Sequence, residues 1–449
     1  MTGIFDVHTI GNVVFKNRLL RSSVGGRTCN YDGTLTDVWK NFERRFAEGG
    51  VGGIVSTTFA VDRDRVSPLQ YPSLADDRNM RLLERFLPQI KLDGCRYIVQ
   101  IGDPGYATQT SLFNEPQDAL SSSDGWDVTF GYSNRRVAMD GRHIEQTIRD
   151  FGAAARRAKN AGADGVEITA AKGYLIHQFL SPAINRRDDR WGLGPDDRFR
   201  LLEEIVRQVR GAVGRDFLVG VRMAHDDFAT LPWLFSLLRS PRAAGNDAAQ
   251  MQEYARSVRE LGVDYLHICG GYGFPNPFDI PGRFPTAEIR MHFNATRHLG
   301  TKAWWRALVF NLVPLWLLDR LLNIGWRVNP GINLAGAIGI HQHLADRPIP
   351  IIVNGGFERR DDVERALDAG MTMVSMARAL IANRYLPNDL RDGQAPRARP
   401  CTYCSRCVGR TATSPLGCYD LSRFPAATPL QSQRMMQDQI MEWNRGDIA

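Results

Sequence analysis

Residues 164–192 read DGVEITAAKGYLIHQFLSPAINRRDDRWG and carry the strongest signal in the chain for both fold and chemistry. The apolar run 165–169 predicts a buried strand, and Tyr174 follows shortly after it. In a barrel of parallel strands, catalytic groups lie at the carboxyl ends of the strands. A lone tyrosine is more often a core aromatic, but the varied polar chemistry around Tyr174 favours a functional site.

Eight apolar runs of strand length alternate with segments of helical period. The candidate strands are Arg18–Val24, Gly53–Thr57, Tyr97–Ile101, Gly165–Thr169, Leu218–Met223, Tyr265–Cys269, Ile349–Asn354 and Thr372–Met376. The repeated units predict an α/β fold, a closed (β/α)8 TIM barrel whose strands are covered on both faces. A doubly wound sheet would usually carry a Gly-x-Gly-x-x-Gly turn after its first strand, and none follows there.

A set of spaced residues within 164–192 resembles the block after the fourth barrel strand in the old yellow enzyme family of FMN oxidoreductases. The matching positions are Gly173-Tyr174-Leu175, Gln178-Phe179-Leu180, Pro182, Asn185, Arg187, Asp189 and Gly192. The resemblance implies an FMN-dependent oxidoreductase with an FMN-binding barrel over residues 1–395.

The resemblance also implies a set of FMN contacts at the barrel mouth. They are Ser22, Ser23, Val24 and Gly25 under the ring, Gln100 at its pyrimidine edge with Thr57 and Thr58 nearby, Arg222 beside N1, and Asn354, Gly355, Gly356, Ala377 and Arg378 at the phosphate. Glycine backbone and a short helix N-terminus after the last two strands are also how barrels build phosphate sites. Arg222 has an alternative interpretation as half of a salt bridge, and a Gly-Gly pair alone is often only a turn.

The resemblance assigns the substrate side of the site to Tyr174, Lys172 and Thr169. Tyr174 would be the proton donor, since a phenol with a pKa near 10 is protonated at neutral pH. Typical members place two histidines, or a histidine and an asparagine, where this chain has Thr169 and Lys172. Lys172 would stabilise an enolate or a carboxylate, or else be a solvated surface lysine. His177 is interpreted as structural.

The implied reaction is reduction of an activated C=C bond, in an enoyl or dienoyl thioester or an enone, by hydride from flavin N5 and a proton from Tyr174. Two alternatives remain: an amine or alcohol dehydrogenase of the trimethylamine dehydrogenase type, and an electron-transfer subunit without substrate chemistry. Longer relatives carry a further dinucleotide-binding domain, which we do not expect in a chain ending at Ala449. Electrons would enter from NAD(P)H or from a redox partner protein.

Residues 396–449 form a predicted cysteine-rich extension. Cys401, Cys404 and Cys407 are spaced Cys-x-x-Cys-x-x-Cys, and Cys418 follows. Such closely spaced thiols reach one metal centre only if the chain folds tightly, as iron-sulfur loops do, whereas zinc sites more often use two separated Cys-x-x-Cys pairs. The segment resembles that of the branch with 2,4-dienoyl-CoA reductase and trimethylamine dehydrogenase, which implies a [4Fe-4S] cluster on these four cysteines. Zinc and unligated thiols remain open.

A long insertion between the sixth and seventh strands spans about 270–348 and carries Trp304, Trp305, Trp316 and Trp326. Its uncharged run 307–318 is too short to cross a bilayer core of about 30 Å. Three interpretations remain: a lid, a subunit interface, or a helix lying on a membrane with Arg306, Arg320 and Arg327 toward the head groups. Aromatic stripes are usually packed, so a lid or interface is favoured over peripheral membrane contact.

The composition is that of an ordinary globular enzyme. The chain has 449 residues, of which 43% are hydrophobic and 23% charged, enough to bury a large core. The net charge of +7 without a basic run predicts small anionic ligands and no nucleic acid. The N-terminus lacks the pattern of a signal peptide, so we expect a cytoplasmic protein with reduced cysteines. We also expect a small-molecule substrate and a homo-oligomer.

Overall fold

The computed structural model describes residues 3–65, 69–107, 119–129, 132–228, 245–272, 276–278, 280–393, 395–411 and 413–443. Eight parallel strands pair in sequence order, and the pairing of β14 with β3 closes them into a barrel. The strands are β3 (Leu19–Arg21), β4 (Gly53–Val55), β6 (Arg96–Gly102), β10 (Gly165–Ala170), β11 (Leu218–Ala224), β12 (Tyr265–Cys269), β13 (Ile351–Asn354) and β14 (Met373–Met376). The predicted (β/α)8 TIM barrel is confirmed, with strand ends shifted by a few residues.

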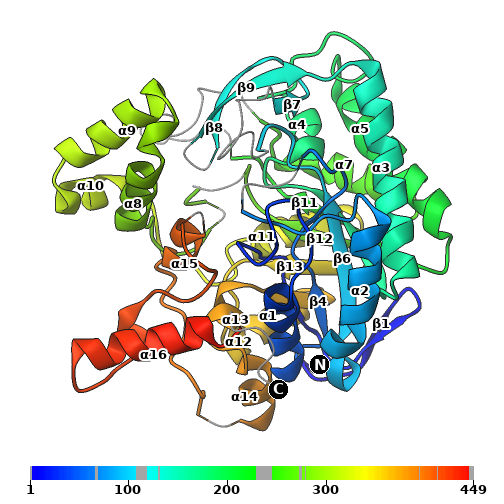
Figure 1. The fold of residues 1–449 in the computed structure, drawn as a ribbon. Helices are drawn as coiled ribbons and strands as arrows, with labels where there is room; N and C mark the ends of the chain where they lie inside the picture. Colours follow the sequence, from blue (N-terminus) through cyan, green and yellow to red (C-terminus); the bar gives the residue numbers. More distant parts are fainter. Residues whose placement is uncertain are drawn as a thin grey trace.

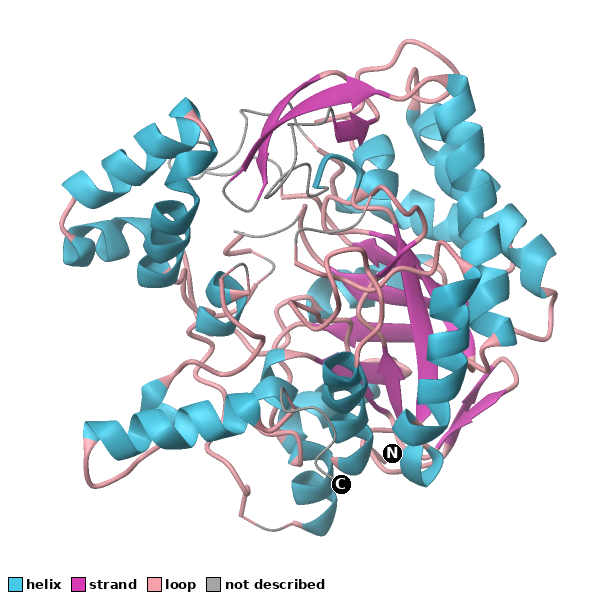
Figure 2. Cartoon of the chain, viewed as in Figure 1, coloured by secondary structure: helices cyan, strands magenta, loops and turns pink. Residues whose placement is uncertain are grey.

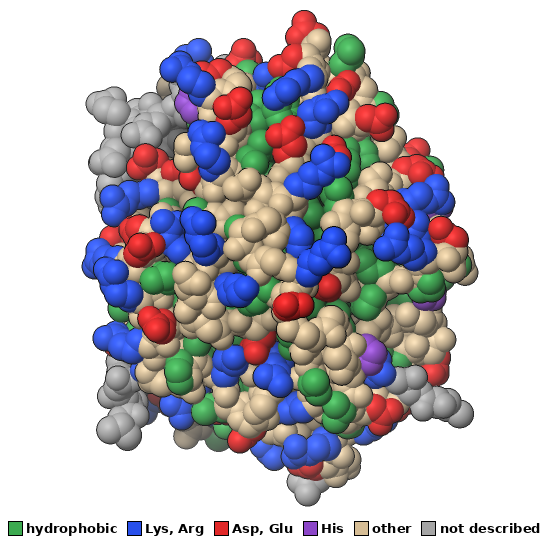
Figure 3. All heavy atoms as spheres, turned by 90° about the vertical axis from the view of Figure 1, so that its right-hand side faces the viewer, with side chains coloured by type: hydrophobic (Ala, Val, Ile, Leu, Met, Phe, Trp, Pro, Cys, Tyr) green, Lys and Arg blue, Asp and Glu red, His purple; other side chains and the backbone are tan. Residues whose placement is uncertain are grey.

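Helices cover the outside of the barrel, as Figures 1 and 2 show. They are α1 (Asp37–Glu48), α2 (Asp77–Ile90), α3 (Gly141–Asn160), α5 (Pro195–Val213), α7 (Ala248–Glu260), α11 (Leu334–His343) and α12 (Arg360–Asp368). Helix α3 begins where the Asp140 side chain accepts a hydrogen bond from His143 N, and it buries Ile144, Ile148 and Phe151. Figure 3 shows the face on the right of Figure 1, where charges of both signs are interspersed.

The inside of the barrel changes from apolar to polar along the strands. At the amino-terminal end, Ile98, Tyr265 and Met373 form one apolar cluster with Ile10, Val13 and Phe15. Those last three come from the hairpin of β1 (His8–Ile10) and β2 (Val13–Phe15), which closes this end. Because side chains of a strand alternate with period two, the next inward positions are Gln100, His267 and Ser375. The polar layer therefore lies toward the carboxyl ends of the strands.

Further short elements follow the barrel strands. β5 (Phe59–Ala60) pairs with the end of β6, and β7 (Ala119–Ser121), β8 (Gly125–Thr129) and β9 (Tyr132–Ala138) form a separate sheet. The short helices α4 (Leu175–Leu180), α13 (Arg378–Ala382) and α14 (Leu386–Asp392) follow β10 and β14.

Within the insertion, the helices α8 (Thr286–Thr296), α9 (Thr301–Leu312) and α10 (Leu315–Leu322) stand apart from the barrel strands in Figure 1. They share a small core that includes Phe284, Phe293, Phe310 and Trp326. Trp304, Trp305 and Trp316 are exposed. Among the described helices, none is long and apolar enough to cross a membrane.

The C-terminal extension runs across the barrel toward the insertion and back. It contains α15 (Arg406–Arg410) and α16 (Pro429–Met441). Helix α15 packs against α8 of the insertion, whereas Trp443, after α16, packs against Phe42 of α1. The extension therefore contacts both the insertion and the barrel.

Candidate functional site

Residues predicted for the substrate side meet at the end of β6. A side chain at Gly102 would overlap Thr169 and would lie 3.7 Å from a ring carbon of Tyr174. It would also lie 2.8 Å from the Thr58 methyl group. Glycine at this position therefore leaves room for three side chains from separate segments of the chain to approach one another.

Gln100 is the centre of a hydrogen-bond network at the barrel mouth. Its Oε1 accepts hydrogen bonds from Ser23 Oγ at 2.9 Å and from Thr58 Oγ1, and its Nε2 donates to Glu167 Oε1 at 2.7 Å. The amide orientation is fixed by these partners, because Glu167 accepts and the hydroxyls donate. The structure thus brings Ser23, Thr58 and Gln100 together, as the sequence analysis expected, and adds Glu167.

Below Gln100, Glu167 is fully buried and paired with His267. Glu167 Oε2 lies 2.8 Å from His267 Nδ1 and accepts a hydrogen bond from Tyr265 at 3.1 Å, while His267 Nε2 lies 2.7 Å from Ser375 Oγ. Burial lowers the pKa of His267. Burial alone would raise the pKa of Glu167, but His267, Arg222 and the hydrogen bonds outweigh it and lower that pKa. At neutral pH the pair is therefore a carboxylate and a neutral imidazole.

The guanidinium of Arg222 is a cation at the barrel mouth. Its Nη1 donates to Ser22 Oγ at 3.3 Å. Within the described residues its Nε is buried and has no hydrogen-bond acceptor. A buried donor without an acceptor is costly unless a ligand supplies one, and flavin N1 would do so. The salt-bridge interpretation has no support here, because no carboxylate pairs directly with Arg222 among the described residues.

Tyr174 shares a hydrogen bond with the hydroxyl of Tyr71, a residue that the sequence analysis missed. Burial, reinforced by Tyr71, raises the pKa of Tyr174 well above its usual value. The phenol therefore holds its proton across the physiological range. Lys172 Nζ donates to the carbonyl of Gly270 at 2.5 Å, which fixes its charge between β10 and β12.

His177 lies on α4, one turn beyond Tyr174, and is fully buried. Its Nε2 is 2.7 Å from Asp227 Oδ1, and its Nδ1 accepts the backbone N–H of Gly173 at 3.2 Å. Ser181 Oγ donates to the same Asp227 carboxylate at 2.6 Å. These bonds hold the turn that carries Tyr174.

The structure places Thr57 differently from its predicted neighbours. Its hydroxyl lies 2.9 Å from the Val24 carbonyl and 3.2 Å from Glu43, away from Gln100. Thr58 takes the place beside the amide. Gly25 has a close contact with the Thr57 methyl group that leaves no room for a side chain, so the backbone of the turn after β3 packs directly on the loop after β4.

The predicted phosphate residues follow β13 and β14. Gly355 and Gly356 have φ of +136° and +87°, which favours glycine, and Asn354 accepts a hydrogen bond from Asn333 at 3.0 Å. Ala377 precedes α13, whose first residue is Arg378. Arg378 Nη1 donates to Ser405 Oγ at 3.0 Å. Arg378 thus faces the cysteine segment.

The four cysteines of the extension line one small cavity, together with Arg378 and Arg423. Tyr403 and Ser405 have φ of +54° and +56°, a conformation that wraps the chain tightly around the thiols. In the described part of the chain, however, no group of three or more possible ligands is close enough to hold a metal ion. Burial raises the pKa of Cys401 to about 12. Since metals bind the thiolate, a metal would have to offset this burial.

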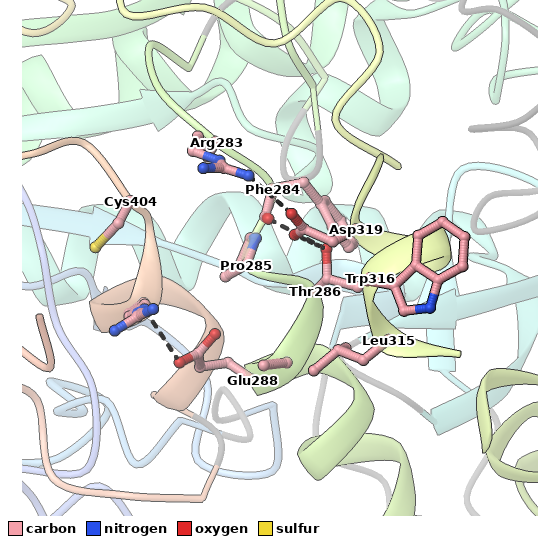
Figure 4. A pocket seen from close by; sticks show the side chains of 11 residues that line it. Arg283, Phe284, Pro285, Thr286, Glu288, Leu315, Trp316, Asp319 and Cys404 are labelled. Carbon is pink, nitrogen blue, oxygen red and sulfur yellow. Dashed lines mark hydrogen bonds and ion pairs between the residues drawn. The ribbon is translucent and has the colours of Figure 1, made fainter. Parts of the chain in front are cut away.

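A larger pocket of about 590 Å³ lies between α8, α10 and the cysteine segment (Figure 4). Leu315, Trp316 and Cys404 contribute to its wall. Two cations at its rim are paired: Arg283 lies 2.7 Å from Asp319, and Arg406 lies 3.6 Å from Glu288. The described lining residues include none of the predicted FMN contacts, so this pocket is separate from the barrel mouth.

Comparison with known proteins found relatives over most of the chain. The profile of the NADH:flavin oxidoreductase / NADH oxidase family matches residues 3–231. A metal reductase of Desulforamulus reducens is 29% identical over 408 residues, which are 90% of this chain and 51% of the relative. An NADPH dehydrogenase of Geobacillus sp. is 30% identical over 298 residues, 65% of this chain and 81% of the relative.

Among solved structures, a complex of 2-naphthoyl-CoA reductase with 2-naphthoyl-CoA has a similar fold. Its TM-score is 0.75 at 22% identity, over 96% of this chain and 57% of the other. The chain spans about half the length of several relatives that it matches, including the metal reductase at 51%.

Proposed function

Because the chain belongs to the NADH:flavin oxidoreductase / NADH oxidase family, we propose that it binds FMN at the barrel mouth and reduces an activated C=C bond. FMN, when bound, would accept hydride from NAD(P)H and deliver it from N5. The observation that carries the proposal is the position of Tyr174, whose ring meets Thr169 at the end of β6 and which lies near enough to Arg222 for the guanidinium to affect its pKa. An acid and a cation facing one mouth suit a reaction that adds a hydride and a proton.

The residues present fit FMN. Arg222 Nε is a buried donor without an acceptor in the described residues. The loop glycines Gly355 and Gly356 follow β13, where barrels bind phosphate, in a backbone conformation that favours glycine. Gln100, held by Ser23, Thr58 and Glu167, would present a fixed amide to the ring.

Tyr174 would donate its proton to the substrate carbon next to the one that receives hydride. Its hydrogen bond to Tyr71 gives a second hydroxyl from which the proton can be replaced. Lys172, held by the Gly270 carbonyl, would bind the carbonyl or carboxylate end of the substrate. A thioester is one such substrate, and the similarly folded 2-naphthoyl-CoA complex supports this class.

We further propose a [4Fe-4S] cluster on Cys401, Cys404, Cys407 and Cys418. The shared cavity and the left-handed residues of the loop support it. Arg378, which begins α13 and bonds Ser405, would link the phosphate loop to the cluster segment. The cluster would pass electrons between the flavin and a redox partner protein.

The test is a pair of half-reactions measured anaerobically on purified protein. Tyr174→Phe should keep FMN reduction by NADH or NADPH, and slow reoxidation by an enoyl-CoA or enone about a hundredfold or more. Tyr254→Phe is the matched control, since the Tyr254 phenol of α7 donates to the Pro195 carbonyl of α5 at the outside of the barrel. Unchanged reoxidation in Tyr174→Phe would remove the proton donor from the mechanism. Reduction of the flavin by an amine, with no activity on alkenes, would favour the dehydrogenase alternative.

A further inference from the structure

The outer face of α9 is apolar although it faces solvent. Ala307 and Phe310 pack into the core of the insertion, and Ala303 on the same side is buried. On the opposite side, Trp305, Val309 and Leu312 follow one another at helical spacing and are 57%, 54% and 73% exposed. The helix is therefore apolar on both sides, which a helix that packs only on its own protein does not need.

Exposed apolar side chains also lie on α10 and the turn after it. Trp316, Ile324 and Val328 are 69%, 61% and 55% exposed. Isolated exposed apolar residues are ordinary, but a contiguous group marks a surface for a partner or a membrane. The sequence favoured packing as a lid or interface, because aromatic stripes are usually buried. The exposure of Trp305 and Trp316 leads us to a different inference.

The charges around this face are predominantly positive. Residues 289–345 contain Asp319 as their only acid, and it pairs with Arg283 at 2.7 Å. Their cations are Arg290, Arg297, Lys302, Arg306, Arg320 and Arg327, of which Arg297, Arg320 and Arg327 are exposed. A second copy of the same face would bring these cations together, whereas an anionic surface would complement them. The opposite side of the molecule mixes both signs, as Figure 3 shows.

We propose that α9, α10 and residues 323–328, here called the apolar face, dock on the surface of a membrane that contains anionic lipids. Trp304, Trp305 and Trp316 would lie at the boundary between head groups and acyl chains, the level that tryptophan prefers. The exposed arginines would contact lipid phosphates. The helices have 12 and 8 residues, so they would lie in the plane of the interface and not cross it. Figure 1 shows these two helices at the outer edge of the molecule, where no barrel helix lies in front of them.

The experiment is flotation of the full-length protein with phosphatidylcholine vesicles, with and without phosphatidylglycerol. The wild type should float with the anionic vesicles and, in a clearly smaller fraction, with the neutral ones. The triple variant Trp305→Ser, Leu312→Ser, Trp316→Ser should lose roughly tenfold or more of its vesicle-bound fraction, because burial of these side chains supplies most of the binding. Arg320→Gln with Arg327→Gln should weaken binding and remove its dependence on salt.

The matched control is Leu193→Ser with Leu430→Ser, which removes two side chains that are 71% and 57% exposed elsewhere on the molecule. This variant should float as the wild type does. Near-ultraviolet circular dichroism of each variant checks that it is folded. The proposal fails if the folded wild type does not float with anionic vesicles. It also fails if the triple variant only converts an oligomer to a monomer in light scattering, since the face would then be an interface between copies of the chain.

Discussion

The barrel and the insertion distribute polarity in opposite ways. The barrel buries charge: Arg21 and Glu43, and Glu167 and His267, are fully inaccessible to solvent. The insertion exposes apolar side chains, with Leu312 73% and Trp316 69% exposed. Both arrangements cost free energy in the isolated chain. We infer from this difference that each region has the polarity of what it binds. The barrel interior binds a polar ligand, and the outer side of the insertion contacts an apolar surface.

The largest expected effect is on the segment that joins the two regions. Anaerobic wild-type protein should carry about four irons per chain, because four thiolates are what a cubane cluster requires. Cys404→Ser should lose that iron and its absorbance while FMN stays bound, since the predicted FMN contacts lie on the barrel loops. Ser405→Ala, one residue on, should keep the iron. One zinc and no iron in anaerobic wild type would overturn this prediction.

The next effect concerns the buried charge of the barrel. Glu43→Leu leaves Arg21 without its carboxylate, and also removes the acceptor of the Tyr97 hydroxyl at 3.2 Å. We expect the free energy of unfolding to fall by about 3–5 kcal/mol, the usual cost of breaking a buried pair. Glu48→Gln on the same helix breaks an exposed pair with Arg44 and should cost less than about 1 kcal/mol. Urea unfolding measures the free energy of both variants. Equal losses would show that burial of the ion pair does not determine its contribution to stability.

The stability of the insertion should depend on pH in the acid range. Burial lowers the pKa of His292 in α8 to about 4. The unfolded histidine has a pKa near 6.5, so between these values the unfolded state binds more protons and stability falls as the pH drops. The loss approaches about 3 kcal/mol near pH 4. His292→Gln should remove it, which tryptophan fluorescence across an acid titration would detect. An unchanged acid transition would contradict the assignment.

The smallest expected effect is on the free energy of unfolding, and it tests whether the outer side of α9 is exposed. Leu312→Ser should change the free energy of unfolding by no more than about 0.5 kcal/mol, because this side chain contributes little to packing. Phe310→Ala, two residues earlier, removes a ring that stacks edge to face on Phe293 with centroids 4.7 Å apart. It should cost about 3 kcal/mol or more. Similar costs for the two variants would mean that the outer side of α9 is packed after all.

The barrel and much of its mouth follow from sequence pattern. Continuous apolar runs fix the strands, and the strand period of two then fixes which residues point inward, including Gln100 and Arg222. This alternation of inward and outward side chains applies only within a strand. β4 ends at Val55, so alternation no longer tells Thr57 from Thr58, and the structure places Thr58 beside Gln100.

Other parts of the site depend on contacts between distant segments. Tyr71 lies in an irregular stretch with no periodic signal, and only the fold brings it to Tyr174. Arg378 turns toward Ser405, a residue of the extension. The insertion shows the same limit, because α9 has apolar residues on every side and its pattern cannot indicate which side is buried.

The loop that holds the cysteines also joins two other segments, the loop after β13 and the chain just before α8. The Tyr403 hydroxyl donates to the Gly356 carbonyl at 2.6 Å, and its own carbonyl accepts Arg283 N at 3.0 Å, directly after Gly282. Gly282 packs so closely on Tyr403 that no side chain would fit there. For protein engineering, it follows that the insertion cannot be grafted onto another barrel by itself. Residues 401–407 would have to be transplanted with it, as the second half of one exchangeable unit.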